Sequence, residues 1–325
     1  MNNSAPADIE CRNLGPSGLR VSAVGLGCNN FGRAGTVTQT QKGTDAVVHA
    51  AIDAGVTLLD GADIYGGERG LSETLMGKAL KGKRDRVVLA TKFGMDMEGA
   101  NGPDWDARGS RRYIRLAVEA SLTRLQTDWI DLYQLHTPDP HTPIEETLAA
   151  LDELIAEGKV RYIGHSNLSG WQIADAEFTA RLSGHPKFIS AQNEYSLLAR
   201  DAEREVLPAV REYRLGFLPY FPLYNGILTG KYTNGSGPAD SRVTKLKPQL
   251  LDTVNWEVLE RYQAFCDERA ITMLQATFAW LLAQPNLTSV IAGATTPEQI
   301  VQNVGAASAW TPTTQEVEQI GALFA

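Results

Sequence analysis

Four polar residues lie at or just beyond the ends of apolar segments, and their side chains could together move a proton. Asp60 and Tyr65 fall in the stretch LLDGADIYGG, Lys92 closes the segment RVVLATK, and His136 closes IDLYQLH. A free tyrosine has a pKa of about 10, so a phenol that donates a proton near neutral pH gains from a cation that stabilises the phenolate. Lys92 could be that cation, provided that a carboxylate such as Asp60 keeps its ammonium charged.

A histidine beside such a phenol could hydrogen-bond a substrate carbonyl and orient it. The set therefore suits protonation of an oxygen while a second reactant adds to the carbonyl carbon, and it includes no evident nucleophile for acyl transfer. A hydride would complete the reaction, and a cofactor must supply it because side chains cannot. Each residue also has a simpler explanation, since Lys92 could merely pair with Asp60 and His136 could belong to a turn.

Eight short apolar segments alternate with helix-length amphipathic ones. Near-continuous apolarity is typical of parallel strands that are buried on both faces. The eight segments span residues 23–28, 57–62, 86–92, 130–136, 160–167, 188–195, 216–223 and 288–294. Apolar residues at spacings of three and four predict helices, packed on a sheet by one face, over residues 43–55, 72–80, 110–125, 143–159 and 202–213. We therefore expect a (β/α)8 TIM barrel, formed as a single domain over residues 1–325.

The ligand site of a (β/α)8 barrel lies at the carboxyl ends of its strands. Asp60, Lys92 and His136 belong to three consecutive predicted strands, and Tyr65 follows the first of these, so we expect them to meet at one mouth. Extra length follows the third and seventh strands, at residues 93–109 and around 232–248, where long loops often act as lids or binding loops. The segment before the first strand, residues 11–22, predicts an N-terminal hairpin that could plug the opposite end of the barrel.

Composition limits the other partners. A net charge of −8 without a run of Lys or Arg argues against nucleic-acid binding. Neither a basic-then-apolar start nor a continuous apolar stretch of membrane-spanning length occurs, so we expect a cytoplasmic protein with small-molecule partners and no membrane contact. Cys11, Cys28 and Cys266 are too scattered for a disulfide framework or a zinc site, and the sequence predicts no particular oligomeric state.

Seven motifs follow one another across nearly the whole chain: LLDGADIYGGERGLSE, VVLATK, DLYQLHTPD, GKVRYIGHSN, AQNEYS, PLYNGILTGKY and IAGATTPEQIVQN. In these motifs the chain resembles the aldo-keto reductases, in the branch that includes potassium-channel β-subunits and bacterial homologues. The resemblance implies a (β/α)8 barrel that binds NADPH and reversibly reduces an aldehyde or ketone to the alcohol. It also implies that Tyr65 is the general acid, that Lys92 and Asp60 tune it, and that His136 orients the carbonyl.

The same resemblance implies a set of cofactor contacts. Ser166, Asn167 and Gln192 match residues that bind the nicotinamide carboxamide, and Tyr220 matches the aromatic residue that stacks on its ring. Phe221 stands where the family usually has serine, which removes one hydroxyl from the pyrophosphate side. The remaining implied cofactor contacts are Pro222, Leu223, Lys231, Arg242, Gly293, Thr295, Gln299 and Asn303.

By resemblance, Lys231 and Arg242 hold the 2'-phosphate of NADP with help from Thr295. Recognition of a phosphate by charged donors is a physical reason to expect NADPH rather than NADH. Gln299 has two interpretations, because it matches an adenine contact and also lies at capping-box spacing from Thr296 in TTPEQ, a helix start that would attract phosphate. Both interpretations stand at this point.

Other functions fit the sequence less well. No G-x-G-x-x-G follows a predicted strand and no P-loop is present, which argues against a Rossmann dehydrogenase and a P-loop enzyme. A metal-dependent hydrolase could use Asp60, Asp63, His136 and His141, but no metal-binding motif accompanies them and Lys92 would lie near the cation, so we expect no metal. A nicotinamide-binding regulatory subunit with weak turnover is the second alternative, which turnover of NADPH with an aldehyde panel would test.

Overall fold

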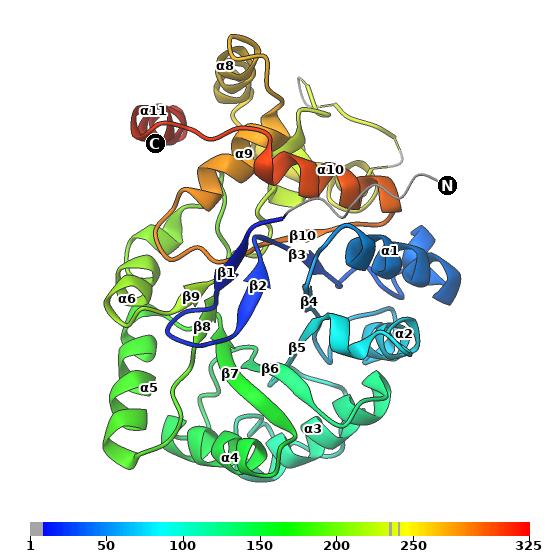
Figure 1. Ribbon diagram of the computed structural model, residues 1–325, viewed down its shortest axis with the longest axis vertical. Coiled ribbons are helices and arrows are strands. Elements are labelled where there is room, and N and C mark those ends of the chain that lie inside the picture. The colour runs from blue at the N-terminus through cyan, green and yellow to red at the C-terminus, as the bar shows by residue number, and fades with distance from the viewer. Residues whose placement is uncertain (1–8, 234–235, 240) are drawn as a thin grey trace.

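The computed structural model describes residues 9–233, 236–239 and 241–325. Eight parallel strands form one sheet in the order β10, β3, β4, β5, β6, β7, β8 and β9, and they run around a central ring (Figure 1). Their bounds are β3 (Val24–Gly27), β4 (Leu58–Asp60), β5 (Val88–Phe93), β6 (Ile130–Leu135), β7 (Val160–Ser166), β8 (Ser190–Gln192), β9 (Gly216–Phe217) and β10 (Val290–Gly293).

Backbone hydrogen bonds close the ring between β9 and the residues that lead into β10. Phe217 N donates to Asn286 O at 2.8 Å, and Thr288 N donates to Phe217 O at 2.9 Å. The predicted (β/α)8 barrel is confirmed, and the eight strands fall within the eight predicted segments or overlap them.

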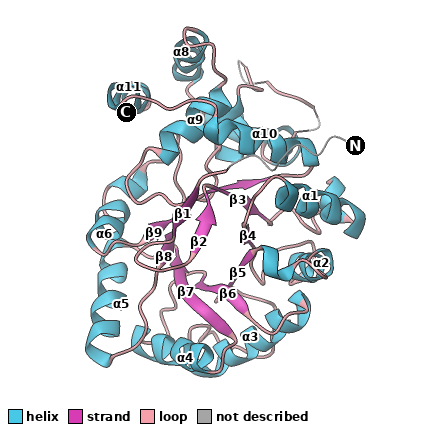
Figure 2. Ribbon diagram, in the orientation of Figure 1, coloured by secondary structure: helices cyan, strands magenta, loops and turns pink. Residues whose placement is uncertain are grey.

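Helices form the outer layer and surround the strands (Figure 2). Capping side chains fix where several of them begin; Ser110 Oγ, for example, accepts a hydrogen bond from Tyr113 N at the start of α3. The helices are α1 (Gln41–Asp53), α2 (Leu71–Ala79), α3 (Arg111–Leu125), α4 (Ile144–Ala156), α5 (Gly170–Ser183), α6 (Val206–Glu212), α7 (Arg242–Leu246), α8 (Trp256–Asp267), α9 (Met273–Leu282), α10 (Pro297–Ser308) and α11 (Thr314–Leu323). Short 3-10 turns are η1 (Val37–Gln39), η2 (Arg84–Arg86), η3 (Asp201–Glu203), η4 (Tyr224–Thr229) and η5 (Pro248–Thr253). Within the described residues, none of the helices combines the length and apolarity needed to cross a membrane.

The predicted N-terminal hairpin is present as β1 (Cys11–Asn13) and β2 (Arg20–Ser22), an antiparallel pair that crosses the barrel opening in Figure 1. Leu14 and Val21 are fully buried and pack against the apolar side chains inside the barrel. Gly15 has φ +57°, and a Cβ there would lie 2.3 Å from the Ile189 carbonyl, so only glycine fits this close approach. The hairpin therefore closes the amino-terminal end of the barrel.

The two predicted long insertions follow β5 and β9. The first connects β5 to α3 without a regular element, whereas the second contains η4, α7 and η5 before α8 begins. Residues 234, 235 and 240 of the second insertion lie outside the described part of the chain. Both insertions lie at the carboxyl ends of their strands, where a barrel builds its ligand site.

The inside of the barrel changes from apolar to polar along its axis. Because side chains alternate between the two faces of a strand, residues two apart on one strand point the same way. The apolar layer contains Leu58, Ala90 and Leu132, and the polar layer beyond it contains Asp60, Lys92 and Gln134. The strands thus deliver buried polar groups to the end of the barrel opposite the hairpin.

Candidate active site

Asp60 and Lys92 form a buried ion pair between neighbouring strands. Lys92 Nζ lies 2.8 Å from each carboxylate oxygen of Asp60 and 2.8 Å from the carbonyl oxygen of Gly61. Both side chains are almost inaccessible to solvent. Burial by itself lowers the pKa of Lys92, but Asp60 and Tyr65 more than offset this, so the pKa is raised and the ammonium stays charged.

Tyr65 lies over this pair, in the loop between β4 and α2. The Lys92 ammonium is 5.3 Å from the centre of the phenol ring. Burial raises the pKa of Tyr65, the Lys92 charge opposes that rise, and the Asp60 charge adds to it. The phenol is therefore protonated at neutral pH, with a cation beside it to stabilise the phenolate once the proton has left.

His136 faces Tyr65 from the end of β6. The two rings are nearly perpendicular, with centroids 5.9 Å apart. Burial, and then the positive charge of Lys92, lower the pKa of His136 to about 3. The imidazole is thus neutral across the physiological range, and its buried Nδ1 has no hydrogen-bond partner within the described structure. A neutral imidazole next to a phenol can donate one hydrogen bond without competing as an acid.

Two glutamines complete the surroundings of Asp60. Gln134 Nε2 donates to Asp60 Oδ1 at 3.3 Å, and Gln192 Nε2 donates to the same oxygen at 3.1 Å. The stem of Gln134 passes over Gly164, where a Cβ would lie 3.2 Å from Gln134 Cγ. Gln134 was not predicted from the sequence, and its position on β6 two residues before His136 was the available signal. Gln192 was expected at a nicotinamide, whereas here its amide donates to Asp60.

A second buried network holds the loop that carries Tyr65. Asp63 accepts a hydrogen bond from Asn101 Nδ2 at 2.9 Å. Arg124 in turn donates to Asn101 Oδ1 at 2.9 Å and to Glu73 Oε2 at 2.7 Å. The backbone adds a bond of 3.1 Å from Ser72 N to the Tyr65 carbonyl. Tyr65 is therefore fixed through both α2 and α3. Asp63 serves this network, while His141, the other residue considered for a metal, is exposed.

The expected nicotinamide contacts form one hydrogen-bonded group beside His136. Asn167 Nδ2 donates to the His136 carbonyl at 2.9 Å and to Ser166 Oγ at 3.1 Å. Tyr220 OH donates to Asn167 Oδ1 at 2.9 Å, and Ser166 Oγ donates to the Gln192 carbonyl at 2.8 Å. Asn167 adopts φ +61°, a conformation that asparagine tolerates better than most residues. The ends of β7 and β8 and the Tyr220 ring thus surround one side of the mouth.

Left-handed backbone conformations are concentrated just after Tyr220. Phe221, Tyr224 and Asn225 have φ of 50°, 46° and 59°, and the buried Oδ1 of Asn225 has no hydrogen-bond partner within the described structure. Such conformations cost about 1 to 3 kcal/mol each and are concentrated at ligand sites. Pro222 and Leu223 lie inside this segment. Lys231 is exposed, with its ammonium 5.4 Å from the Tyr232 ring; the side chain of Arg242 lies outside the described part of the structure.

The start of α10 supplies the remaining expected contacts. Gln299 Oε1 accepts from Thr295 N at 2.8 Å and from Thr295 Oγ1 at 3.2 Å, while Thr296 accepts from Gln299 N. The Gln299 side chain therefore caps its own helix through the Thr295 N–H, whereas a capping box would use the N–H of Thr296. Gly293 ends β10, and Asn303 is buried on α10.

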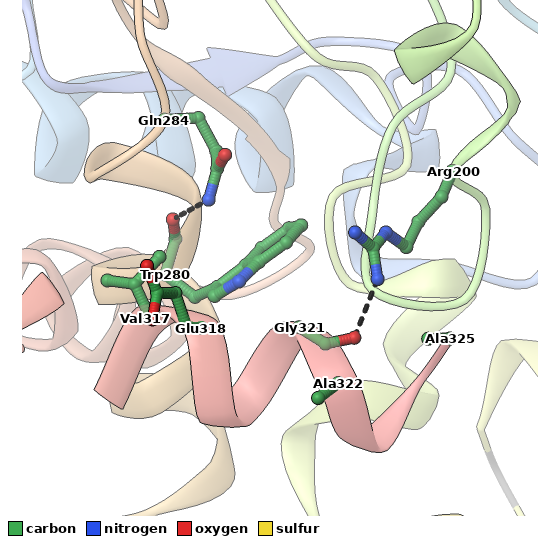
Figure 3. Close-up of a pocket in the computed structure, with 8 residues that line it drawn as sticks. All are labelled: Arg200, Trp280, Gln284, Val317, Glu318, Gly321, Ala322 and Ala325. Carbon is green, nitrogen blue, oxygen red and sulfur yellow. Dashed lines mark hydrogen bonds between the residues drawn. The ribbon is translucent and has the colours of Figure 1, made fainter. Parts of the chain in front are cut away.

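A separate hollow of about 380 Å³ lies between α9 and α11 (Figure 3). Arg200 crosses it, donating to the Gly321 carbonyl at 2.6 Å, and Gln284 Nε2 donates to the Trp280 carbonyl at 3.0 Å. The first bond ties the segment of Arg200 to α11, whereas the second is local to the end of α9. None of the residues of the ion pair or its neighbours lines this hollow. It is distinct from the barrel mouth.

Comparison with known proteins matches the model of the aldo/keto reductase family to residues 23–324. An uncharacterized oxidoreductase, YrpG, of Bacillus subtilis (strain 168) is 38% identical over 304 residues, covering 92% of this chain and 91% of the relative. A probable aldo-keto reductase 1 of Glycine max is 37% identical, covering 92% of this chain and 85% of the relative. A probable voltage-gated potassium channel subunit beta of Oryza sativa subsp. japonica is 36% identical, with coverages of 92% and 91%.

The match covers every strand of the barrel and the loop that carries Tyr65. It agrees with the resemblance that the sequence motifs indicate, including the branch that contains channel β-subunits. This protein therefore belongs to the aldo/keto reductase family and is an oxidoreductase.

Proposed function

We propose that the protein reduces an aldehyde or ketone with NADPH, and that Tyr65 donates the proton. The observation that carries this proposal is the position of the Lys92 ammonium, held by both oxygens of Asp60 at 2.8 Å and 5.3 Å from the Tyr65 ring. A buried cation beside a half-buried phenol is an arrangement for stabilising a phenolate.

The proton balance of the reaction follows from this geometry. When bound, a reduced nicotinamide supplies a hydride to the carbonyl carbon. The Tyr65 O–H bond breaks and its proton passes to the carbonyl oxygen, so that the substrate becomes an alcohol and Tyr65 a phenolate. Lys92 stabilises that phenolate, and Asp60 keeps Lys92 charged and in place. Oxidation of an alcohol runs through the same groups in reverse.

Neutral His136 is suited to orienting the substrate rather than to protonating it. With a pKa of about 3 it carries no charge at pH 7, so an N–H that faces the mouth can donate to the carbonyl oxygen. The rings of Tyr65 and His136 lie 5.9 Å apart between centroids, so both residues can donate to one substrate oxygen.

The groups beside His136 fit a nicotinamide. A carboxamide needs both donors and acceptors, and Ser166, Asn167 and Gln192 supply a hydroxyl and two amides at adjacent strand ends. Tyr220 supplies an aromatic surface next to them. In this proposal Pro222, Leu223, Gly293 and Asn303 line the rest of the cofactor cleft, and Lys231, Arg242 and Thr295 hold the 2'-phosphate.

The test is NADPH consumption in the presence of a panel of aldehydes and ketones, followed by the absorbance of NADPH. We expect turnover with several of them, since the tetrad of Asp60, Tyr65, Lys92 and His136 is complete. Tight NADPH binding without turnover on any of them would contradict the proposal and favour a regulatory subunit.

A further inference from the structure

Arg33 lies at the mouth of the site, in the segment that follows β3. The Gly67 N–H, two residues after Tyr65, donates to the Gly32 carbonyl at 3.0 Å, so this segment lies directly against the Tyr65 loop. Arg33 Nη2 donates to the carbonyl of Asn29 at 3.2 Å, which turns the guanidinium back toward the end of β3. Strand β3 pairs with β4, the strand that carries Asp60.

The segment holds Arg33 in a defined position. Gly32 N donates to the Thr38 carbonyl at 2.9 Å, Thr38 Oγ1 donates to the Asn30 carbonyl at 3.0 Å, and Thr36 Oγ1 donates to the Arg33 carbonyl at 2.9 Å. These bonds brace the turn from both sides. The guanidinium is therefore presented by an ordered turn.

The charge of Arg33 is not neutralised by the protein. Its side chain is half-buried, and no carboxylate of the described residues lies within 4 Å of it. Among those residues, the guanidinium donates a hydrogen bond to the carbonyl of Asn29 alone. Burial lowers the pKa of Arg33, and Tyr65 is the group whose charge opposes this. Arg69, also at this rim, differs: it pairs with Glu98 at 2.7 Å.

We propose that Arg33 binds an anionic group of the substrate, so that this reductase prefers carbonyl compounds that carry a carboxylate or a phosphate. The inference rests on the proposed function, because it places the anion next to a carbonyl that is bound at Tyr65. A half-buried guanidinium with most of its donors unused is a ready partner for a planar carboxylate or a phosphate. On a chain with net charge −8, a cation at the mouth also offsets the repulsion of an anionic substrate.

The pyrophosphate of the cofactor has the same chemistry and is the other possible source of the anion. The substrate is favoured because the Gly67–Gly32 hydrogen bond holds the turn that carries Arg33 directly against the loop of Tyr65, the group that would protonate the substrate oxygen. The two sources differ in their consequences: a substrate contact changes only reactions of charged substrates, whereas a pyrophosphate contact changes NADPH affinity and every reaction alike.

The experiment compares 4-formylbenzoate with its methyl ester, two aldehydes that differ in one negative charge. We expect the unmodified protein to favour the carboxylate in kcat/KM by about tenfold or more, the effect of one charge-assisted contact. Arg33→Gln should remove this preference through KM and leave the ester unchanged. Arg33→Lys should retain part of it, because the charge remains and the planar fork is lost. Arg69→Gln is the matched control and should keep the preference.

Equal use of the two aldehydes by the unmodified protein would overturn the proposal while leaving the reductase function intact. Equal loss on both aldehydes in Arg33→Gln, together with weaker NADPH binding, would also overturn it and assign the anion to the cofactor. If neither aldehyde reacts, the proposal is tested by calorimetric binding of 4-(hydroxymethyl)benzoate and its methyl ester in the presence of NADP+. The proposal is supported if the carboxylate binds and Arg33→Gln weakens this binding at least tenfold. It is overturned if the carboxylate does not bind in this way.

Discussion

The Lys92 ammonium contacts both carboxylate oxygens of Asp60 at 2.8 Å, and this one bond pair sets the charge that the Tyr65 phenol experiences. Lys92 lowers the pKa of the phenol and Asp60 raises it, so the distance of each charge from the phenol determines how far their effects cancel. In the proposed mechanism both residues act on substrate only through Tyr65, so we expect their contributions to be interdependent.

Lys92→Met should abolish most turnover, and Asp60→Asn should weaken it because the ammonium loses its charged partner. We expect the double variant to be little worse than Lys92→Met alone, because both changes act through one phenol. Steady-state rates of the two single variants and the double variant measure the coupling. Losses that add in log kcat would show that the two residues act separately.

Gln134 should influence the pH profile although it cannot reach the substrate. Its amide donates to Asp60 Oδ1, so Gln134→Met leaves the Asp60 charge less compensated. Since Asp60 raises the pKa of Tyr65, that pKa should rise further, and the alkaline limb of the reduction profile should move to higher pH by up to about one unit. Ser190→Ala, a buried change inside the same barrel, is the control and should not move the limb. An unchanged limb with only lower stability would show that Gln134 is a packing residue.

His165 should make the fold sensitive to acid. It is fully buried, neither ring nitrogen has a hydrogen-bond partner among the described residues, and burial lowers its pKa to about 3. As the pH falls, the histidine of the unfolded chain, with a pKa near 6.5, takes up a proton before the buried histidine does. The free energy of unfolding is therefore highest above about pH 6.5 and decreases as the pH falls from 6.5 to about 3. The loss is about 1.4 kcal/mol per pH unit, or about 2 kcal/mol between pH 6.5 and pH 5.

His136 contributes in the same direction, so His165→Leu should remove about half of this pH dependence. Urea unfolding at pH 7 and pH 5 measures it, with His141→Gln as an exposed control that should behave like the unmodified protein. The idea fails if His165→Leu and the unmodified protein lose the same free energy of unfolding over this interval.

Lys231 and Arg242 should decide the choice between NADPH and NADH. Each charge-assisted contact to a 2'-phosphate is worth roughly 1.5 to 3 kcal/mol. Replacing both with alanine should weaken NADPH binding by about one to several decades and leave NADH binding nearly unchanged. Lys245→Ala, an exposed change on α7, is the matched control. Fluorescence titration at low salt measures the affinity of each of the three proteins for both cofactors, and equal affinities for the two cofactors in the unmodified protein would refute the assignment.

The sequence predicted the barrel because its strands are buried on both faces and therefore apolar throughout, a signal that does not depend on distant contacts. It also predicted that Asp60, Lys92 and His136 come together, since the register of neighbouring parallel strands follows from the fold. Strand ends were less well predicted: β8 covers only Ser190–Gln192 and β9 only Gly216–Phe217, because the polar or proline-containing residues that follow leave the sheet to build the rim.

Contacts made by flexible side chains were not predictable from pattern. Gln134 lies on a strand that is apolar on both faces, so the sequence does not show whether its side chain points into the barrel or toward the helices. The bond of Gln192 to Asp60 depends on a side-chain rotamer, which the sequence does not show either. Arg33 was not among the predicted site residues, since the absence of a carboxylate partner is visible only in three dimensions. After α8, helix α9 is apolar on nearly all sides because it is buried, so it lacks the three- and four-residue periodicity that marks a surface helix.

The central claim, that Tyr65 is the proton donor, is tested most directly by Tyr65→Phe, which removes one hydroxyl and keeps the ring. We expect kcat for carbonyl reduction to fall by about 10²- to 10⁴-fold, as is typical for loss of a general acid, while the Kd for NADPH stays within a few-fold of that of the unmodified protein. A kcat within a few-fold of the unmodified value, measured on the same aldehyde at the same pH, would contradict it.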